Sequence, residues 1–187
     1  MPDREVSRPT VPMQRVLVSG ISGAGKSTLA RRIAELRDLP YTELDALHHG
    51  PGWVRRPEFE RDAVKLAAHD RWITEDQYHT FIGDLLWQRA DSVVWLDLPR
   101  RVVMWRVTTR TLARLLLRRR LFNGNRERWR DLVDPGHPVR WSWSQHGPRR
   151  ERTAELARAH GHVHVVRLRT TREVRAWLHA LAGMTAE

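Results

Sequence analysis

The residues of this sequence best spaced for chemistry lie in one short stretch, GISGAGKST, from Gly20 to Thr28. Two glycines, a lysine and a serine stand there at the spacing G-x-x-x-x-G-K-[ST]. Glycine lets a loop turn successive backbone N–H groups toward phosphate oxygens, while the lysine reaches the β and γ phosphates and the serine hydroxyl can ligate Mg²⁺. The stretch therefore predicts a site for a nucleoside triphosphate with magnesium. The residues expected to form this site are Gly20, Ser22, Gly23, Ala24, Gly25, Lys26, Ser27 and Thr28.

Lys26 also stands out against the composition of the chain. Of 33 basic residues, only Lys26 and Lys65 are lysine, and every other basic position is arginine. A lysine kept in such a sequence indicates a need for a compact ammonium on a flexible stem. This agrees with the phosphate-binding role that the glycine-rich stretch predicts for Lys26.

A second candidate feature is the arginine-rich run RVTTRTLARLLLRRR, residues 106–120. Arginine recurs there at every fourth residue from Arg106 to Arg118, so on a helix these like charges are neighbours and repel by roughly 0.2–0.5 kcal/mol per pair. Such a helix is explained if it faces an anion. For Arg114 and for residues 118–120, a solvated helix face is the alternative interpretation.

The charge of the whole chain supports a local anion site more than a uniformly basic surface. The formal net charge is +11, and residues 100–150 hold 14 arginines against three acids. Outside that window, 19 basic residues face 19 acidic ones. A basic patch of this kind also fits a nucleic acid, which is the rival interpretation.

Composition limits the remaining classes of protein. The chain has no cysteine, so disulfides and thiolate metal sites are excluded, and no apolar run approaches the ~20 residues that span a bilayer. Residues 1–13 carry acids and prolines without an apolar stretch, so we expect a flexible tail rather than a signal peptide, and a cytoplasmic protein. Residues 14–187 are expected to form one domain. Nothing in the sequence indicates the oligomeric state.

The pattern of elements that must position these residues alternates between strand and helix. Such alternation predicts an α/β fold with a mostly parallel, doubly wound sheet. The expected strands are 15–19, 41–44, 71–75, 92–98 and 162–168. The expected helices are 26–36, 57–69, 81–90, a long one after Pro99, 148–160 and 171–181, and the segment 121–148 has weak periodicity. Four tryptophans within these elements, Trp87, Trp95, Trp105 and Trp177, are expected in the core.

Beyond the glycine-rich stretch, the segments LDALHHGPGW, WITEDQYH, WLDLP, RVTTR and NGNRERW resemble a known family. The sequence is similar to the small P-loop kinases related to adenylate kinase and shikimate kinase, and within them to bacterial proteins labelled DNA topology modulation proteins. The resemblance covers most of residues 14–180. It implies a three-layer fold with five parallel strands in the order 2-3-1-4-5, a core that binds ATP, and an arginine-rich lid at about 119–148.

The resemblance also implies roles for acidic residues. Glu75 lies where such kinases place the acid that steadies Mg²⁺, usually through water; a solvated carboxylate at a strand end is the alternative. Relatives commonly read acid-Gly-Asn-Tyr there, whereas this sequence reads Glu75-Asp76-Gln77-Tyr78, which adds a charge near the phosphates. Asp45 matches the acid that shikimate-type kinases direct at the acceptor hydroxyl, with a helix or turn cap as the equal alternative.

Neighbouring residues have less specific expectations. His48 and His49 could line the acceptor pocket, and their spacing predicts no zinc site. Asp97 is expected to organise the turn before Pro99 rather than to act in catalysis.

The same resemblance gives roles to four arginines. Arg106 and Arg110 match a pair that approaches phosphates and stacks on adenine, and Arg149 and Arg150 match arginines that reach the transferring phosphoryl group. With Lys26, Asp45 and Mg²⁺, these would stabilise a loose phosphoryl transition state. The expected function is phosphoryl transfer from Mg-ATP to a small acceptor, nucleotide-like or hydroxylated. A nucleic-acid-associated ATPase is the alternative, and no membrane partner is expected.

Overall fold

The computed structural model describes residues 13–116 and 138–184. The expected tail up to residue 12, the expected lid as far as residue 137, and residues 185–187 lie outside this part of the chain. Met13, the last residue of the expected tail, is 2% exposed and packs in the core. No helix among the described residues has the length and apolar character needed to cross a membrane.

Four parallel strands form the sheet that organises the molecule. They are β1 (Arg15–Gly20), β2 (Trp72–Glu75), β3 (Ser92–Leu96) and β4 (His164–Leu168). They lie in the order β2-β1-β3-β4, with Val18 of β1 aligned to Glu75 of β2 and to Val94 of β3. The prediction of a parallel α/β sheet is confirmed, and these four strands keep the relative order that was expected. The prediction of five strands is wrong.

The missing strand is the expected one at 41–44. In its place a single parallel bridge joins Tyr41 to Ile73, with hydrogen bonds from the Thr42 amide to the Ile73 carbonyl and from the Ile73 amide to the Pro40 carbonyl. The chain then leaves the sheet because helix α2 begins at Leu44, whose amide donates to the buried carboxylate of Glu75 at 3.4 Å. A side chain at the end of β2 thus takes the N–H that a strand would have used for the ladder.

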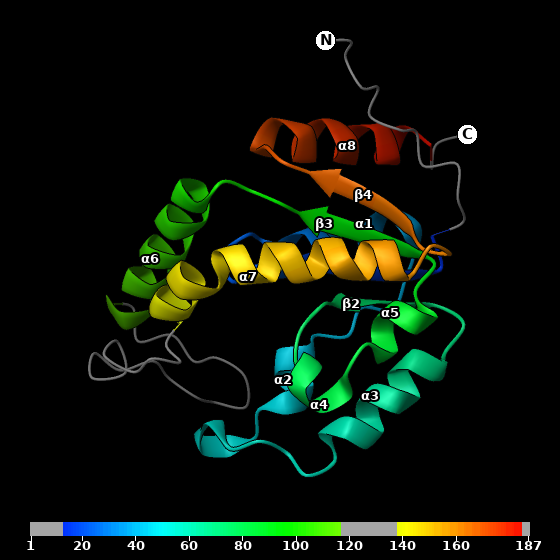
Figure 1. The fold of residues 1–187 in the computed structure, drawn as a ribbon, viewed down its shortest axis with the longest axis horizontal. Coiled ribbons are helices and arrows are strands. Elements are labelled where there is room, and N and C mark those ends of the chain that lie inside the picture. The colour runs from blue at the N-terminus through cyan, green and yellow to red at the C-terminus, as the bar shows by residue number, and fades with distance from the viewer. Residues whose placement is uncertain (1–12, 117–137, 185–187) are drawn as a thin grey trace.

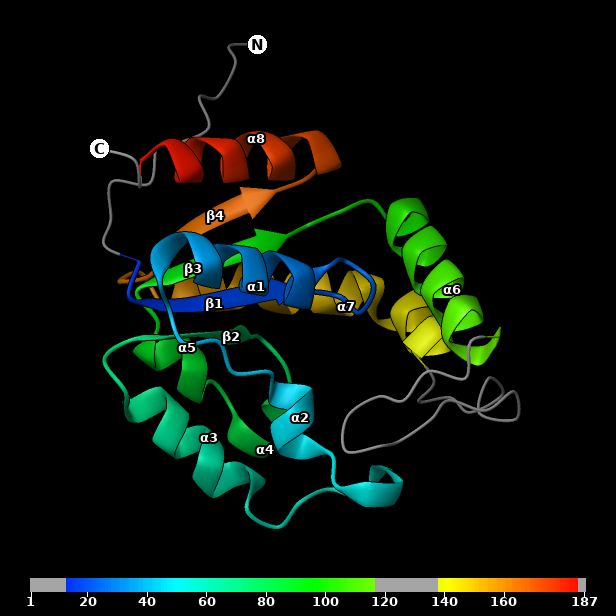
Figure 2. The same cartoon turned by 180° about the vertical axis from the view of Figure 1, so that it is seen from behind.

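Helices cover both faces of the sheet. Their bounds are α1 Lys26–Arg37, α2 Leu44–His48, α3 Phe59–Ala68, α4 His79–Ile82, α5 Leu85–Arg89, α6 Arg100–Leu116, α7 Pro138–Ala159 and α8 Thr171–Gly183, with a short 3₁₀ turn, η1, at Pro51–Trp53. Figure 1 shows α7 in front of the sheet, and Figure 2, from behind, shows α1 on the opposite face. Helix α6 stands beyond the carboxyl ends of the strands in both views.

The core is divided by the sheet into two parts. On one face, Ile33 of α1 packs with Trp177 and Leu181 of α8, all three fully buried. On the other, Phe59 and Trp87 form the centre of the second cluster. Burying side chains of this size stabilises the fold by about 1.5–3 kcal/mol each, which fixes the helices that carry the site.

One tryptophan departs from the expected core. Trp105 is 73% exposed, whereas Trp87, Trp95 and Trp177 are buried as predicted. Trp105 lies on α6 one residue before Arg106. Because the Arg106 side chain points toward the glycine-rich loop, the adjacent Trp105 side chain points toward solvent. Helical geometry separates adjacent side chains by roughly 100° around the axis.

Two helices also begin or end differently from the sequence prediction. The expected helix 81–90 is divided into α4 and α5 at Gly83, whose φ of +53° interrupts the helical path. Helix α7 starts at Pro138 rather than at 148, so residues 138–148 of the expected lid are helical and pack along α6 (Figure 1). Pro148 was expected at the helix start, where proline is well tolerated, but lies inside α7.

Candidate active site

The glycine-rich loop connects the end of β1 to the start of α1, at the carboxyl edge of the sheet. Gly23 and Gly25 have φ of +87° and +101°, which glycine adopts without strain. A Cβ on Gly23 would lie 2.9 Å from the Cβ of Val107 and 3.0 Å from the carbonyl oxygen of Val103. The loop therefore needs glycine at 23 both for its path and for the close approach of α6.

Lys26 is the first residue of α1 and is buried. Burial, and after it the nearby Arg149 guanidinium, lowers the pKa of its ammonium from 10.5 to about 8, while Glu75 and Asp45 act in the opposite direction. These four groups come from α1, α7, the end of β2 and α2. The structure therefore brings together four of the residues that the sequence singled out, two of them cations and two of them carboxylates.

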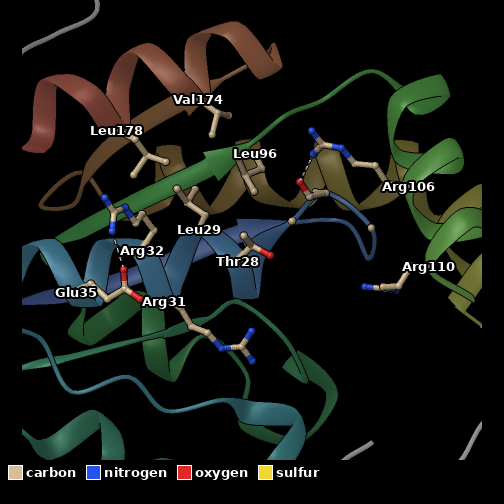
Figure 3. A pocket seen from close by; sticks show the side chains of 13 residues that line it. Thr28, Leu29, Arg31, Arg32, Glu35, Leu96, Arg106, Arg110, Val174 and Leu178 are labelled. Carbon is tan, nitrogen blue, oxygen red and sulfur yellow. Dashed lines mark hydrogen bonds and ion pairs between the residues drawn. The ribbon is translucent and has the colours of Figure 1, made fainter. Parts of the chain in front are cut away.

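The two arginines of α6 reach the loop from its other side. Arg106 donates to the carbonyl of Ala24 at 2.9 Å and to the hydroxyl of Thr171 at 3.2 Å, and Arg110 donates to the Ser22 hydroxyl at 3.3 Å. Figure 3 shows both side chains extending from α6 toward the loop. Their four-residue spacing places both guanidiniums on the helix face that meets the glycines.

A cavity of about 650 Å³ opens beside this loop, between α1, α6 and α8. Its walls include Leu29, Leu96, Val174 and Leu178, and Arg106 lies at one end (Figure 3). The volume lies in the range of small-molecule sites, and apolar walls with a few fixed polar groups are typical of them. The cavity can accept a flat, largely apolar group whose charged end lies at the loop.

The residues predicted to hold magnesium lie at the end of β2 and in the first turn of α1. Glu75 is fully buried, accepts a hydrogen bond from the Tyr41 hydroxyl at 2.7 Å, and accepts another from the Leu44 amide. Ser27 follows Lys26 on α1 and is half-buried. Because protein donors already engage both oxygens of Glu75, this carboxylate fits a metal held through water better than one bound directly. Among residues 13–116 and 138–184, no cluster of three or more His, Cys, Asp or Glu could hold a metal by itself.

Asp45 lies on α2 within a cluster of aromatic side chains. The Tyr78 hydroxyl donates to Asp45 Oδ1 at 2.5 Å and also lies 3.1 Å from His49 Nε2. The ring of His48 stacks on Tyr78 with centroids 4.0 Å apart, and burial lowers the pKa of His48 to about 4, so this imidazole is neutral at pH 7. One oxygen of Asp45 is thereby fixed by Tyr78, which orients the other.

Asp76 is a site residue whose role the sequence did not reveal. It is 2% exposed and follows Glu75 at the end of β2. Its carboxylate accepts from the Ser19 hydroxyl at 2.6 Å, from the Trp87 indole at 3.2 Å, and pairs with Arg149 at 2.9 Å. The sequence marks Asp76 as a departure from the family pattern, but its partners lie up to 73 residues away and no local signal indicates them.

Arg150 forms a different ion pair from that of Arg149. Its Nε lies 3.0 Å from Asp97, whose carboxylate also pairs with Arg167 of β4 at 2.6 Å. The Arg150 side chain is 53% exposed. Arg149 and Arg150 point to different acids because they are adjacent on a helix. Arg149 lies near Lys26 and Arg150 lies against Asp97, and the expectation that both reach the phosphoryl group stays a prediction. Asp97 holds two arginines at the strand end, beyond its expected role in the turn.

Other contacts at the loop were not anticipated from the sequence. The Ser142 hydroxyl of α7 donates to the Ser22 carbonyl at 3.0 Å, and Ser142 is fully buried. The sequence placed Ser142 in an irregular segment, so no pattern pointed to it. Residues 118–120 lie outside the described part of the chain, as do the acids and arginines of the expected lid before residue 138.

No family model matches the chain, and no curated protein matches it. Among solved structures, shikimate kinase from Acinetobacter baumannii in complex with shikimate is 17% identical, with 93% of each chain covered and a TM-score of 0.55. Shikimate kinase from Bacteroides thetaiotaomicron is 13% identical, covers 94% of this chain and 100% of its own, and has a TM-score of 0.53.

The chain has the fold of shikimate kinases. This agrees with the broader resemblance to small P-loop kinases that the sequence indicated. Neither comparison supports the narrower resemblance to DNA topology modulation proteins or an adenylate kinase subtype. At these identities the likeness concerns the arrangement of elements, and the chemistry has to be argued from the residues.

Proposed function

We propose that this protein is an ATP-dependent kinase that transfers the γ-phosphoryl group of Mg-ATP to a hydroxyl of a small acceptor. The observation that carries the proposal is the buried Lys26 at the start of α1, beneath a loop of glycines and beside Arg149. Arg149 is already paired with Asp76, whereas the buried Lys26 ammonium has a lowered pKa and would be stabilised by a further anion. A triphosphate supplies that anion and also accepts the N–H groups at the start of α1.

The nucleotide would bind with its base in the cavity between α1, α6 and α8. Arg106 and Arg110 then lie between the base and the phosphates, and each is already oriented by the loop. Phosphoryl transfer depends mainly on positioning and on stabilising the charge of the peripheral oxygens. Groups held by the fold before the substrate arrives need little rearrangement to do this.

Magnesium belongs to this proposal through Ser27 and Glu75. Mg²⁺ usually keeps several waters and binds through one or two protein groups together with substrate phosphates. The Ser27 hydroxyl would bind the ion directly, and Glu75 would hold it through water. Held by these two residues, the ion would supply positive charge that offsets the charge of the phosphates.

Asp45 would receive the proton of the acceptor. In the transfer, the acceptor oxygen forms a bond to the γ phosphorus, the bond from that phosphorus to the β–γ bridging oxygen breaks, and ADP leaves. The hydroxyl proton passes to the Asp45 oxygen that Tyr78 does not occupy. The aromatic rings around Asp45 favour an acceptor with a flat or ring-shaped body.

An ATP-consumption screen tests the proposal. The candidate acceptors are hydroxylated ring acids, sugars, nucleosides and nucleoside monophosphates, each with Mg²⁺. Turnover with one of them should fall by at least about 100-fold in Lys26→Ala. Arg152→Ala, which removes an exposed arginine of α7 paired with Asp84, is the matched control and should retain activity. Turnover that survives in Lys26→Ala contradicts the proposal.

A further inference from the structure

The contact between Asp76 and Arg149 joins two parts of the molecule that a moving lid would keep separate. Arg149 lies on α7, in the sequence just after the segment that the family resemblance assigns to a lid. Its Nη2 lies 2.9 Å from Asp76 Oδ2 and also donates to the Asp76 backbone carbonyl. The Arg149 side chain is 12% exposed, so the pair is largely removed from water.

The carboxylate of Asp76 is itself held rigidly by the body of the protein. Oδ2 accepts from the Ser19 hydroxyl of β1 at 2.6 Å, and Oδ1 accepts from the Trp87 indole of α5 at 3.2 Å. His79 of α4 adds a contact to Oδ1 at 3.2 Å. Three elements other than α7 therefore fix the position of the Asp76 carboxylate. This carboxylate in turn positions the Arg149 guanidinium.

The Arg149 guanidinium has a further donor that the pairing with Asp76 does not use. Arg149 uses Nη2 on Asp76, while its buried Nε has no hydrogen-bond partner in the described part of the chain. The same guanidinium lies close enough to Lys26 to lower the pKa of that ammonium. An unpaired buried donor of this kind can donate to a further oxygen, and it is costly until one arrives.

We propose that Asp76 is a positioning residue that fixes Arg149 at the phosphate site before nucleotide binds, so that this arginine belongs to the preformed site. The inference rests on the proposed kinase function. Ser19 contributes to the same arrangement because its hydroxyl also lies 3.3 Å from that of Thr153, one turn after Arg149 on α7. The body thus holds α7 at two points around Arg149.

The first experiment needs no activity. In protein labelled with ¹⁵N-arginine and free of nucleotide, the Arg149 Nε–H should give a sharp NMR cross-peak, assigned by its loss in Arg149→Lys. The peak should persist in Arg152→Ala and broaden or vanish in Asp76→Asn. A peak equally sharp in folded Asp76→Asn overturns the proposal. Addition of Mg-ATP should shift the peak; no shift counts against the proposed function and leaves the comparison of variants intact.

The second experiment uses turnover with the acceptor found by the screen. Asp76→Asn should lower kcat by about 10–100-fold with the affinity for ATP changed less than about three-fold, because Arg149 acts mainly in the transition state. Arg149→Ala should lose a similar amount, and the double variant little more. A higher kcat in Asp76→Asn would show that the pair withholds Arg149, and overturns the proposal.

Ser19→Ala tests the same proposal if Asp76→Asn does not fold. It removes one hydrogen bond to the carboxylate but keeps both charges of the buried pair. We expect a smaller broadening of the Arg149 peak and a smaller fall in kcat, both in the same direction. Ser19→Ala with an unchanged peak and unchanged kcat, beside an unfolded Asp76→Asn, also overturns the proposal.

Discussion

Lys26 must be charged to bind phosphate, yet the fold places it where charge is costly. Its pKa is lowered from 10.5 to about 8 by burial and by Arg149, so above pH 8 the free protein holds Lys26 mostly neutral. A bound triphosphate favours the ammonium, so binding above that pH takes up a proton. At the scale of the residue, the site therefore titrates within the range of ordinary buffers.

We predict that affinity for Mg-ATP is nearly constant between about pH 7 and pH 7.5 and falls about ten-fold per pH unit well above pH 8. The quenching of tryptophan fluorescence by the nucleotide, titrated at each pH, measures this. Lys26→Met removes the titrating group and should bind weakly with a flat pH profile. A wild-type profile that stays flat to about pH 9.5 would show that Lys26 does not contact the phosphates.

At the scale of the element, the approach of α6 to the loop decides whether the arginines can reach their positions. Gly23→Ala introduces both a strained φ and a contact with Val107 and the Val103 carbonyl. We expect it to lower the free energy of unfolding by about 2–4 kcal/mol and to weaken nucleotide binding.

Gly52→Ala is the matched control for this variant. Gly52 has a φ of +71° but no atom near the position of a new Cβ, so it reports the backbone strain alone. Its cost should be about 1–2 kcal/mol, without an effect on nucleotide binding. Equal losses in the two variants, measured by urea denaturation, would mean that the contact between Gly23 and α6 contributes nothing.

Helix α8 depends on a capping arrangement at its start. The Thr170 hydroxyl accepts from the Glu173 amide at 3.1 Å, and the Glu173 carboxylate accepts from the Arg169 amide at 2.7 Å. Thr170→Ala should lower the free energy of unfolding by about 1 kcal/mol, and Thr170→Ser should restore most of it. Urea denaturation of both variants checks this, and a neutral Thr170→Ala contradicts the assigned cap.

Sequence reasoning succeeded where the signal is local. The glycine-rich loop consists of nine adjacent residues between an apolar strand and a helix, so its structure follows from the conformational preferences of neighbouring residues. The prediction of a strand at 41–44 was wrong because a distant carboxylate, that of Glu75, accepts the hydrogen bond of the Leu44 amide. The predicted start of the helix at 148 was wrong. Proline is typical of a first helical turn, but here the contact of Ser142 and the packing on α6 extend the helix before Pro148.

At the scale of the whole molecule, the parallel sheet gathers separate chain segments at one edge. Glu75 ends β2 and Asp76 follows it, Gly20 ends β1, and Asp97 follows β3, so acids and cations from distant positions meet there. The pairing between Asp76 and Arg149 was outside sequence reasoning for this reason: topology brings them together, and no spacing along the chain encodes it.

This edge makes the stability of the molecule sensitive to acid. Burial alone would raise the pKa of Asp76, but Arg149, His79, Ser19 and Trp87 together hold it below its ordinary value of 3.8. A carboxylate with a lowered folded pKa stabilises the protein above that ordinary value, and the contribution is lost as the pH falls through the folded pKa.

We therefore expect the free energy of unfolding of the wild type to fall more steeply than that of Asp76→Asn between about pH 4 and pH 2. Lys26 of α1 and Arg149 of α7 face this carboxylate and stay charged throughout that interval, and His79 of α4 becomes fully protonated. Urea denaturation at each pH gives both curves. Parallel curves would show that Asp76 is not ionised in the folded protein.

Pro148 creates a point in α7, immediately before Arg149, at which the helix can bend. Proline lacks the N–H that would bond to the carbonyl of Ser144 and its ring crowds that carbonyl, so a helix bends most easily there, the more so beside Gly147. The half of α7 from residue 138 to 147 can swing about this hinge while Arg149 stays anchored. Under the proposed function, a bend at this point would move the start of α7 relative to the phosphate site without breaking the pairing of Arg149 with Asp76.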